Sequence, residues 1–482
     1  MSNIKKLVSL VLLGFFVSCS SDSFTDPNDP KFDDISEESS EDAEDLMNND
    51  LTANVDVTLS VDANDTVEIN PEIFGVNNDW RQIPDNTFSN FATTISSIGN
   101  TLMRYPGGWE SEFYAWSSNA TPGWQNTPAQ PGASVTTLKS NISNYSIVIA
   151  TVDAMNTTLG TSEYNEAIDN LKSRTREAIT ISNIGNGIVE IGNEWWLQAA
   201  GGVSRADKLD KYVTIAMDLA EYIRTEFPSR EFKLLINGDY TKPEEFTTMK
   251  NKFTRGYEEI DGVALHTYTG YQTDTHNIVD LESRIIESAN NFNPNKNFKY
   301  LSEWMPSRLY NDSALYMEAA NLIPDIIQIY ARAASDAAAF WPPINVSIPG
   351  LGLTSTNYAT VFPTGQILGE LSKSYTGVAL KTNSDIFHLA AALNDDNTMV
   401  VFITGGDESG KTVGVEIDGF IADSIENIER YVPTDYSDTA KAEPYITETA
   451  TAEISSNGTL VLDVNKEGPY QIYKVVLKGN RG

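Results

Sequence analysis

The stretch Gly192-Asn193-Glu194-Trp195-Trp196 directly follows a short apolar run at 187–191, and this junction decides how the chain is interpreted. The run is brief, rich in β-branched residues and bounded by glycines, which is typical of a buried strand. A helical pattern begins near Ser204, so Asn193 and Glu194 are predicted to lie where a strand ends and a loop toward a helix begins. In a parallel α/β barrel, catalytic groups gather at that edge.

Strand and helix patterns alternate from residue 71 to residue 373. Strands are predicted at 73–76, 101–105, 146–151, 187–191, 232–237, 260–266, 298–302 and 337–341. Helices are predicted at 88–98, 162–180, 205–227, from 243, near 281, at 313–335 and at 365–372. The second strand is followed by a long Gly-, Pro-, Trp- and Ser-rich loop without a clear helix. Eight such units over about 300 residues predict a (β/α)₈ TIM barrel at 71–374.

The pattern changes to short strands after residue 375. Strand-like runs lie at 378–380, 387–393, 399–404, 413–417, 428–432, 459–464 and 470–477. Turn sequences separate them, which predicts an antiparallel β-sandwich. Two further strands, at 55–62 and 66–69 with a turn at Asn64-Asp65, precede the barrel. We expect them to complete the sandwich, so that this domain is discontinuous and comprises 53–70 and 375–482.

The N-terminus has the pattern of an export signal. Lys5 and Lys6 precede the apolar run 7–17, and small residues lead to Cys19, the only cysteine of the chain. Segment 1–19 resembles a bacterial lipoprotein signal, although Phe16 stands where such signals usually carry Leu. The resemblance implies that Cys19 is lipidated and that the protein is an outer-membrane lipoprotein of the cell envelope, exposed at the surface. An ordinary signal peptide with a chance cysteine is the alternative.

Segment 20–52 is predicted to be a disordered acidic tether between lipid and folded domain, because it is rich in Asp and Glu and poor in large apolar residues. The chain has a net charge of −34, and the residues outside this segment are acidic too, which argues against a nucleic-acid partner. One cysteine and three histidines argue against a zinc or iron site, and no nucleotide-binding motif occurs. We therefore expect no cofactor, no metal and no contact with a membrane except through the lipid.

A second carboxylate follows another predicted strand. Glu303 comes directly after 298–302 and precedes Trp304, just as Glu194 precedes Trp195. Strands four and seven lie across the barrel mouth, so the two carboxylates could converge on one bond. Glycoside hydrolysis needs one carboxylic acid to protonate the leaving oxygen and one carboxylate to attack the anomeric carbon. We interpret Glu194 and Glu303 as this pair, against the alternative that each is a solvated loop residue.

Polar residues at two more strand ends support the pair. His266 and Tyr268 end the sixth strand and offer an imidazole and a phenol to hold Glu303. Arg104 ends the second strand, where its guanidinium would favour the ionised form of Glu303. We expect the indoles around Glu194 to raise its pKa toward the acid role.

All eight tryptophans fall at or just after predicted barrel strands, and none falls in the sandwich or in a predicted helix. This segregation predicts an aromatic-lined cleft at one face of the barrel, whose rings stack on sugars. The alternative is that these rings only pack loops. The predicted substrate-binding residues are Trp80, Arg104, Trp109, Asn193, Trp195, Trp196, His266, Tyr268, Trp304 and Trp341.

Four of these segments resemble motifs of the clan A, or 4/7, retaining glycoside hydrolases: Gly192-Asn193-Glu194, Glu303, His266 with Tyr268, and Arg104-Tyr105-Pro106-Gly107-Gly108. The last is similar to the motif of family 51 arabinofuranosidases, with related forms in families 39, 44 and 86. Two positions depart from family 51, where Pro commonly replaces Trp195 and Asp often replaces Ser302. The resemblance implies that Glu194 is the acid/base, Glu303 the nucleophile and Asn193 a partner of the sugar 2-hydroxyl.

We therefore expect a lipid-anchored retaining glycoside hydrolase that cleaves a β-linked plant or algal polysaccharide internally, by double displacement. An exo-acting α-L-arabinofuranosidase is one alternative, and a surface glycan-binding lipoprotein without catalysis is another. The resemblance further implies a cis peptide bond between Trp341 and Pro342, because barrels of this clan often carry one after the aromatic residue that ends strand eight.

Overall fold

The computed structural model describes residues 55–124, 128, 130–198, 204–270, 276–306, 315–345, 351–384, 387–436 and 443–482. The predicted lipidation site Cys19 and the predicted tether 20–52 lie outside these residues. Among the described helices, none combines the length and the apolar character needed to cross a membrane.

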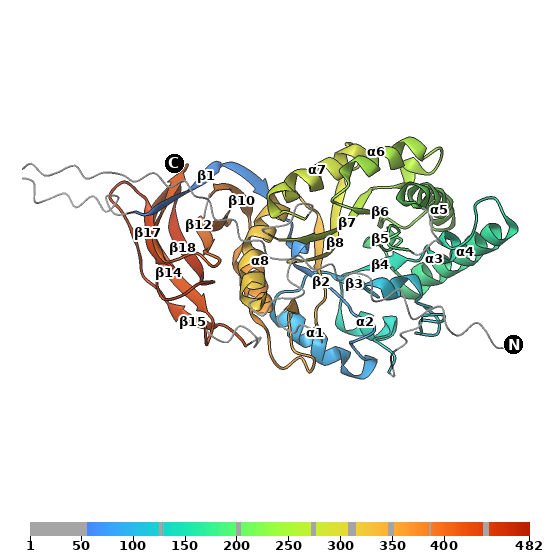
Figure 1. The fold of residues 1–482 in the computed structure, drawn as a ribbon, viewed down its shortest axis with the longest axis horizontal. Coiled ribbons are helices and arrows are strands. Elements are labelled where there is room, and N and C mark those ends of the chain that lie inside the picture. The colour runs from blue at the N-terminus through green and yellow to red at the C-terminus, as the bar shows by residue number, and fades with distance from the viewer. Residues whose placement is uncertain are drawn as a thin grey trace, which may run out of the picture. The chain divides into compact units, whose positions relative to one another are not determined.

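Eight parallel strands close into a barrel in chain order, as the alternating pattern predicts (Figure 1). The strands are β2 (Gly75–Asn77), β3 (Met103–Tyr105), β4 (Tyr145–Ile149), β5 (Ile188–Ile191), β6 (Lys233–Asp239), β7 (Gly262–Thr269), β8 (Phe298–Pro306) and β9 (Ala337–Phe340). The helices are α1 (Phe88–Ser97), α2 (Val135–Asn141), α3 (Val152–Met155), α4 (Ser162–Ser182), α5 (Arg205–Glu226), α6 (Pro243–Lys252), α7 (Leu281–Phe292), α8 (Leu315–Arg332) and α9 (Pro363–Ser374).

The second barrel unit does contain a helix, which the sequence pattern did not reveal. Helix α2 is short and follows the long loop after β3; the side chain of Ser134 caps it by accepting a hydrogen bond from the Thr137 N–H at 3.2 Å. Only Val135 and Leu138 of its residues are buried. Seven residues with two buried apolar positions give too weak a periodicity to be recognised, although the serine cap is a typical start signal.

The interior of the barrel consists of an apolar layer followed by a polar one. Side chains of the apolar layer include Leu102, directly before β3, and Ile188, Leu235 and Tyr300 from β5, β6 and β8. Successive side chains of a strand alternate between its two faces, so the residue two positions further along each strand also points inward. On β3, β5, β6 and β8 these residues are Arg104, Glu190, Asn237 and Ser302, and all four are buried. The polar layer therefore lies nearer the carboxyl end of the barrel.

The second domain is a ten-stranded sheet. It contains β1 (Val57–Glu68), β10 (Val378–Asn383), β11 (His388–Leu393), β12 (Thr398–Thr404), β13 (Lys411–Asp418), β14 (Phe420–Val432), β15 (Ile446–Thr449), β16 (Ala452–Ile454), β17 (Leu460–Val464) and β18 (Ile472–Arg481). β1 lies between β10 and β13, so the predicted discontinuity is confirmed, and Figure 1 shows this blue strand beside the orange and red ones. All pairs are antiparallel except β1 with β13.

The N-terminal strands were expected to be two, separated by a turn at Asn64-Asp65, and this expectation is wrong. The chain continues as the single strand β1, with a register shift against β10 between Asp62 and Thr66. A bulge accommodates the turn-forming residues without ending the strand. The guanidinium of Arg332 on α8 donates a hydrogen bond of 2.8 Å to the Asp65 carboxylate there.

Strands β11 and β12 are buried on both faces because one face covers the sheet's own core and the other covers the barrel. Leu389 and Ala391 belong to the core of the sheet domain, whereas Ala390 and Ala392 pack with the barrel. The side chain of Gln328 on α8 links the two domains, since its Nε2 donates to the Leu380 carbonyl at 2.6 Å and its Oε1 accepts from the Ala391 N–H at 3.1 Å. Successive side chains point to opposite faces, and both faces are buried and apolar, which explains the continuous apolar sequence of these strands.

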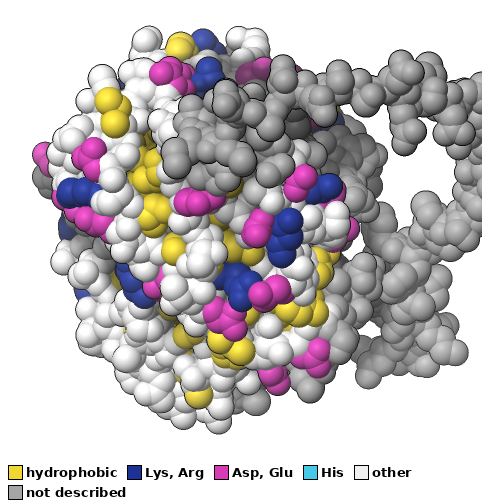
Figure 2. All heavy atoms as spheres, turned by 90° about the vertical axis from the view of Figure 1, so that its left-hand side faces the viewer, with side chains coloured by type: hydrophobic (Ala, Val, Ile, Leu, Met, Phe, Trp, Pro, Cys, Tyr) yellow, Lys and Arg dark blue, Asp and Glu magenta, His cyan; other side chains and the backbone are white. Residues whose placement is uncertain are grey.

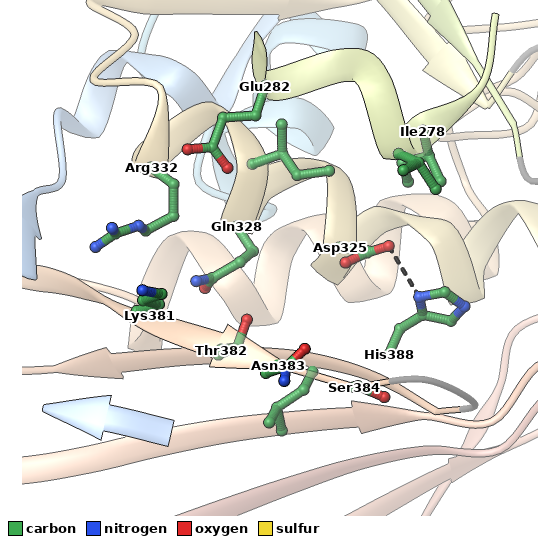
Figure 3. Close-up of a pocket in the computed structure, with 13 residues that line it drawn as sticks. Ile278, Glu282, Asp325, Gln328, Arg332, Lys381, Thr382, Asn383, Ser384 and His388 are labelled. Carbon is green, nitrogen blue, oxygen red and sulfur yellow. Dashed lines mark ion pairs between the residues drawn. The ribbon is translucent and has the colours of Figure 1, made fainter. Parts of the chain in front are cut away.

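A cavity of about 480 Å³ lies where α7 and α8 meet β10 and β11 (Figure 3). The ion pair between Asp325 and His388, 3.0 Å long, borders it. Figure 2 looks onto the side of the molecule that carries the sheet domain, and it shows basic and acidic side chains interspersed with small apolar patches. That face therefore has no large area of a single charge sign among the residues that the picture colours.

Candidate active site

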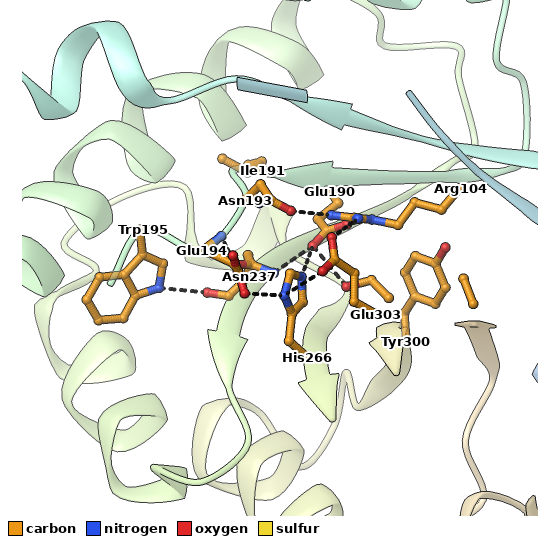
Figure 4. Close-up of polar contacts among 12 residues, drawn as sticks. Arg104, Glu190, Ile191, Asn193, Glu194, Trp195, Asn237, His266, Tyr300 and Glu303 are labelled. Carbon is orange, nitrogen blue, oxygen red and sulfur yellow. Dashed lines mark hydrogen bonds and ion pairs between the residues drawn. The ribbon is translucent and has the colours of Figure 1, made fainter. Parts of the chain in front are cut away.

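Arg104 is the centre of the polar layer, and its guanidinium contacts four side chains (Figure 4). Its Nη1 donates to Glu303 Oε1 at 2.6 Å, and its Nε donates to Glu190 Oε2 at 2.7 Å. Asn193 Oδ1 accepts from Nη2 at 2.8 Å, and Asn77 Oδ1 accepts from Nη1 at 3.1 Å. The arginine is fully buried, so these short charge-assisted contacts offset its desolvation and fix its orientation. The predicted proximity of Arg104 to Glu303 is thus observed.

Glu190 is the one charged residue of this network that was not predicted from the sequence. Its Oε1 accepts hydrogen bonds from Asn237 Nδ2 at 2.6 Å and from Ser302 Oγ at 3.0 Å. Burial raises the pKa of Glu190, but the charge of Arg104 and the contacts with His266 and Arg104 together more than offset this, so the pKa lies below its ordinary value. The available signal was an acidic residue in the middle of an otherwise apolar strand, since an isolated buried charge is too costly to occur without a partner.

Glu303 faces the barrel interior because β8 contains a bulge. In the pairing of β7 with β8, Ala264 lies opposite Tyr300 but His266 lies opposite Glu303, so β8 has one extra residue in this interval. An extra residue interrupts the alternation of faces. Ser302 and Glu303 can therefore both contact the polar layer, although they are adjacent in the sequence.

Both oxygens of Glu303 are held. Arg104 binds Oε1, and the Tyr268 hydroxyl donates to Oε2 at 2.5 Å. His266 Nδ1 lies 3.4 Å from the same Oε2 and 3.1 Å from Glu194 Oε1, so the imidazole lies between the two predicted catalytic carboxylates. The Glu194 side chain is 17% exposed and that of Glu303 only 3%, which makes Glu194 the more accessible of the two.

His266 is held in its protonated form by its neighbours. Burial would lower the pKa of His266, but the charge of Glu303 and the contacts with Glu190 and Glu194 raise it to about 10. An oxygen of Glu194, a nitrogen of His266 and an oxygen of Glu303 lie within 4.8 Å of one another, which is the only such set of three potential metal ligands among the described residues. A protonated imidazole has no lone pair to donate to a metal, so at neutral pH this group favours a proton.

The loop after β5 holds Glu194 in an unusual backbone conformation. Gly192 has φ of 81° and Glu194 has φ of 47°, in the left-handed region that non-glycine residues rarely adopt. The Asn237 side chain holds this turn by accepting a hydrogen bond of 2.8 Å from the Glu194 N–H. The two indoles do not enclose the carboxylate as expected. Trp195 is fully buried, while Trp196 is half-buried with its ring edge-on to His266, at 5.6 Å between centroids.

Glu112 is a second carboxylate that the sequence analysis missed. It is fully buried and accepts hydrogen bonds from the backbone N–H groups of Thr151 at 2.6 Å, Val152 at 2.8 Å and Asn193 at 2.6 Å. Glu112 thus fixes the backbone of Asn193 from the far side of the β5 loop. The Asn193 side chain has a buried Nδ2 without a partner among the described residues, so the hydrogen-bonding capacity of this donor is unused.

Three tryptophans predicted to bind substrate are buried, which corrects that expectation. Trp80, Trp195 and Trp304 are 1%, 0% and 0% exposed. Trp80 Nε1 donates to Asn119, Trp195 is stacked on Tyr212 of α5, and Trp304 packs edge-on against Tyr330 and Phe340. Trp304 follows the bulge in β8, so the same shift that turns Glu303 inward directs the next ring toward α8.

Trp109, Trp196 and Trp341 remain partly exposed, as substrate contact requires. The Trp341–Pro342 bond is cis, so this prediction is confirmed. A Cβ at Gly108 would lie 2.5 Å from Trp341 Cη2, which explains why the ring needs glycine there. Gly107 has φ of 90° and would place a Cβ 1.7 Å from the Asn78 carbonyl oxygen, so the Gly-Gly pair is also required by the backbone.

The structure therefore brings seven of the predicted site residues into one place: Arg104, Asn193, Glu194, Trp196, His266, Tyr268 and Glu303. Trp109 begins the 3-10 helix that follows β3, and Trp341 comes directly after β9, next to Gly108. The residues that support them were not predicted from the sequence: Asn77, Glu112, Glu190, Asn237 and Ser302.

Several solved glycoside hydrolases have this fold. A family 51 α-L-arabinofuranosidase from Bifidobacterium longum has a TM-score of 0.63 at 13% identity, covering 88% of this chain and 99% of that one. A family 44 xyloglucanase from Paenibacillus polymyxa has a TM-score of 0.53 at 12% identity, covering 88% and 99%. A family 39 β-xylosidase from Caulobacter crescentus has a TM-score of 0.52 at 14% identity, covering 87% and 99%. No protein-family model and no curated protein sequence matches the chain. The resemblance to clan A is thus confirmed at the level of the fold: a TIM barrel with a discontinuous sheet domain.

Proposed function

We propose that this chain is a retaining glycoside hydrolase with Glu303 as nucleophile and Glu194 as acid/base. The observation that carries the proposal is that oxygens of these two carboxylates lie within 4.8 Å of each other at the carboxyl end of a TIM barrel. Retaining enzymes separate their carboxyl groups by about 5–5.5 Å, while inverting enzymes need roughly 6.5–9.5 Å to admit a water molecule. The short separation supports double displacement.

The surroundings of each carboxylate fit its proposed role. Glu303 is buried and held by the Arg104 guanidinium and the Tyr268 phenol, which stabilise an ionised nucleophile and orient it. Glu194 is more exposed, so it can reach the leaving oxygen in the first step and water in the second. Protonated His266 lies between them and donates to whichever carboxylate carries more charge. The unpartnered Nδ2 of Asn193 is the donor proposed for the sugar 2-hydroxyl.

The reaction then proceeds in two steps. Glu303 attacks the anomeric carbon while Glu194 gives its proton to the departing oxygen, which leaves a glycosyl ester on Glu303. Glu194, now ionised, removes a proton from water, and the resulting attack releases the sugar with its original anomeric configuration. Arg104 and Tyr268 bind the carboxylate of Glu303 again as its charge returns.

For the substrate we propose a β-linked plant or algal polysaccharide cleaved internally, with Trp109, Trp196 and Trp341 as sugar platforms, since these three rings are partly exposed at the barrel mouth. An exo-acting α-L-arabinofuranosidase is the second candidate, favoured by the family 51 neighbour. Incubation with a panel of plant and algal polysaccharides tests both. Products that shorten from long to short oligomers over time indicate internal cleavage, whereas arabinose as the first and only product indicates the second candidate.

Proton NMR of the first product tests the mechanism. Retained configuration is expected, and inverted configuration would contradict the assignment of Glu303 as nucleophile. Binding of an oligosaccharide without any release of product would instead support a non-catalytic glycan-binding protein.

We further propose that Cys19 anchors the chain to the outer membrane, which rests on the resemblance of segment 1–19 to a lipoprotein signal. Cys19→Ser is expected to move the protein from the membrane fraction to the soluble fraction. An unchanged distribution on detergent extraction would contradict this proposal.

A further inference from the structure

Glu110 lies beside the proposed catalytic residues without a role in their network. It belongs to the short 3-10 helix η4 (Trp109–Glu112), directly after the Gly107-Gly108 pair that follows β3. A Cβ at Gly108 would lie 2.9 Å from Glu110 Oε2 and 2.5 Å from Trp341 Cη2. The carboxylate and the indole therefore meet over the same glycine, so Glu110 lies next to one of the partly exposed rings.

The hydrogen-bonding capacity of Glu110 is largely unused. The residue is 3% exposed, its carboxylate contacts its own backbone N–H, and its one ion pair among the described residues is with Arg81 Nε at 3.6 Å. The Arg81 side chain is itself 43% exposed and lies over the Trp124 ring at 5.9 Å. A buried carboxylate with so few partners costs stability, so packing alone gives no reason for it.

A second carboxylate, Asp79, lies close enough to affect Glu110. Burial raises the pKa of Glu110 to about 8, and the charges of Asp79 and Glu303 add to this while Arg81 opposes it. Burial also raises the pKa of Asp79 to about 6, and Asp79 accepts hydrogen bonds from the backbone and side chain of Gln82. At neutral pH Glu110 is therefore largely a carboxylic acid, which can both donate and accept a hydrogen bond, as a sugar hydroxyl can.

The order of the strands shows which sugar would meet Glu110. Glu194 follows β5, and β9 lies directly across the eight-stranded barrel from β5. The departing sugar must lie on the side of Glu194, because Glu194 protonates its oxygen. The sugar that stays bonded to Glu303 then extends toward β9, β2 and β3, where Trp341, Asp79 and Glu110 lie.

We propose that Glu110 hydrogen-bonds a hydroxyl of the sugar retained on Glu303, remote from the anomeric carbon, and so determines which sugar is accepted there. The sugar packs against the ring face of Trp341, and Glu110 hydrogen-bonds a hydroxyl at the edge of that sugar. This proposal rests on the retaining glycosidase function proposed above.

The test combines a protein variant with a substrate variant. Aryl α-L-arabinofuranoside, β-D-xyloside, β-D-glucoside and the aryl β-1,4-disaccharides of the last two are assayed first with the native sequence. The best substrate is then compared with its monodeoxy analogues, which lack one hydroxyl at position 3 or beyond in the sugar that carries the aryl group. Glu110→Ala is expected to lower kcat/KM for the parent substrate about 10- to 100-fold, the range for losing one such hydrogen bond. Glu110→Gln, which keeps a donor and an acceptor, is expected to restore most of it.

For one deoxy analogue, Glu110→Ala is expected to cause no further loss of kcat/KM. The sugar hydroxyl that this analogue lacks and the carboxyl that the variant lacks are the two partners of the same hydrogen bond. If Glu110→Ala instead lowers kcat/KM by one common factor for the parent and every analogue, the residue is structural and the inference is wrong. Absence of hydrolysis of every aryl glycoside and every polysaccharide by the native sequence would overturn the proposed function itself. The two failures are therefore distinguishable.

Discussion

Glu190 and Glu110 are two buried glutamates at the same end of one barrel, and their surroundings differ in a way that separates two kinds of role. Glu190 has Arg104, Asn237 and Ser302 within 3.0 Å, and its pKa is lowered. Within the part of the chain that the structure describes, Glu110 has one ion pair, with Arg81 at 3.6 Å, and burial raises its pKa to about 8. Burial by itself therefore does not decide the charge of a carboxyl group. A charged partner close enough to compensate for burial decides it, and a carboxyl with few partners can bind a ligand instead.

The largest expected effect concerns the network around Arg104, to which Glu190 and Glu303 belong. Glu303→Gln removes the nucleophile and the charge that pairs with Arg104, so turnover is expected to fall by about 10⁴-fold or more while oligosaccharide binding changes little. Steady-state kinetics and calorimetric titration measure the two quantities. Glu110→Gln is the matched control, because it also replaces a carboxyl group by an amide, but at a carboxyl group that has few partners. This variant should keep most of the turnover. Substantial turnover by Glu303→Gln would refute the assignment of the nucleophile.

A second experiment tests the more exposed carboxylate. Glu194→Ala is expected to lower kcat/KM about 10²- to 10⁴-fold for substrates with poor leaving groups, because acid assistance is lost. Azide should restore turnover of an activated aryl glycoside by entering the vacated space, giving a glycosyl azide of retained configuration. Product NMR identifies that configuration. No rescue by azide, with Glu110→Ala as the control that has no vacated acid/base position, would contradict the role of Glu194.

A smaller effect is expected from Glu190→Gln, which leaves the Arg104 Nε without its charged partner. Misorientation of Arg104 should lower kcat/KM roughly 10- to 100-fold, because small displacements of catalytic groups have effects of that size. The pKa of His266 should also fall from about 10, since Glu190 helps to raise it. The chain has only three histidines, so NMR titration of labelled imidazoles can follow it. Glu110→Gln should leave this pKa unchanged, and equal shifts in the two variants would show that Glu190 and Glu110 do not differ in their coupling to His266.

The smallest expected effect concerns stability. The pKa of Glu110 is raised from 4.5 to about 8 in the folded protein, so its contribution to stability is complete below about pH 4.5 and is lost as pH rises through about 8. Glu110→Gln cannot ionise, and its Tm should therefore fall less than that of the native sequence between pH 5 and pH 9, by roughly 2–4 °C. Thermal unfolding at a series of pH values measures this. Glu258→Gln, at an exposed carboxylate, is the control. Parallel Tm curves for Glu110→Gln and the native sequence would show that the carboxyl is not buried in its neutral form.

The sequence predicted the parts of the site that follow from periodicity. Alternating strand and helix patterns predicted the barrel, and the strand ends then placed Arg104, Glu194, His266 and Glu303 at one edge, because all strands of a parallel barrel end on the same side. The change to short alternating strands after residue 375 predicted the sheet domain. The short helix α2 and the uninterrupted β1 were not predictable in this way, because a two-position apolar pattern and a bulge both give weak local signals.

Only the tertiary structure decided which of these side chains face inward. The bulge in β8 turns both Ser302 and Glu303 toward the polar layer and directs Trp304 outward, and pairing between strands creates it. The partners of Arg104 come from β2, β5, the loop after β5, and β8, so no local sequence window contains them. The chain by itself determined which residue types stand at the strand ends. The closed barrel determined whether each buried carboxyl obtained a partner, since charge compensation depends on distances between strands that are remote in sequence.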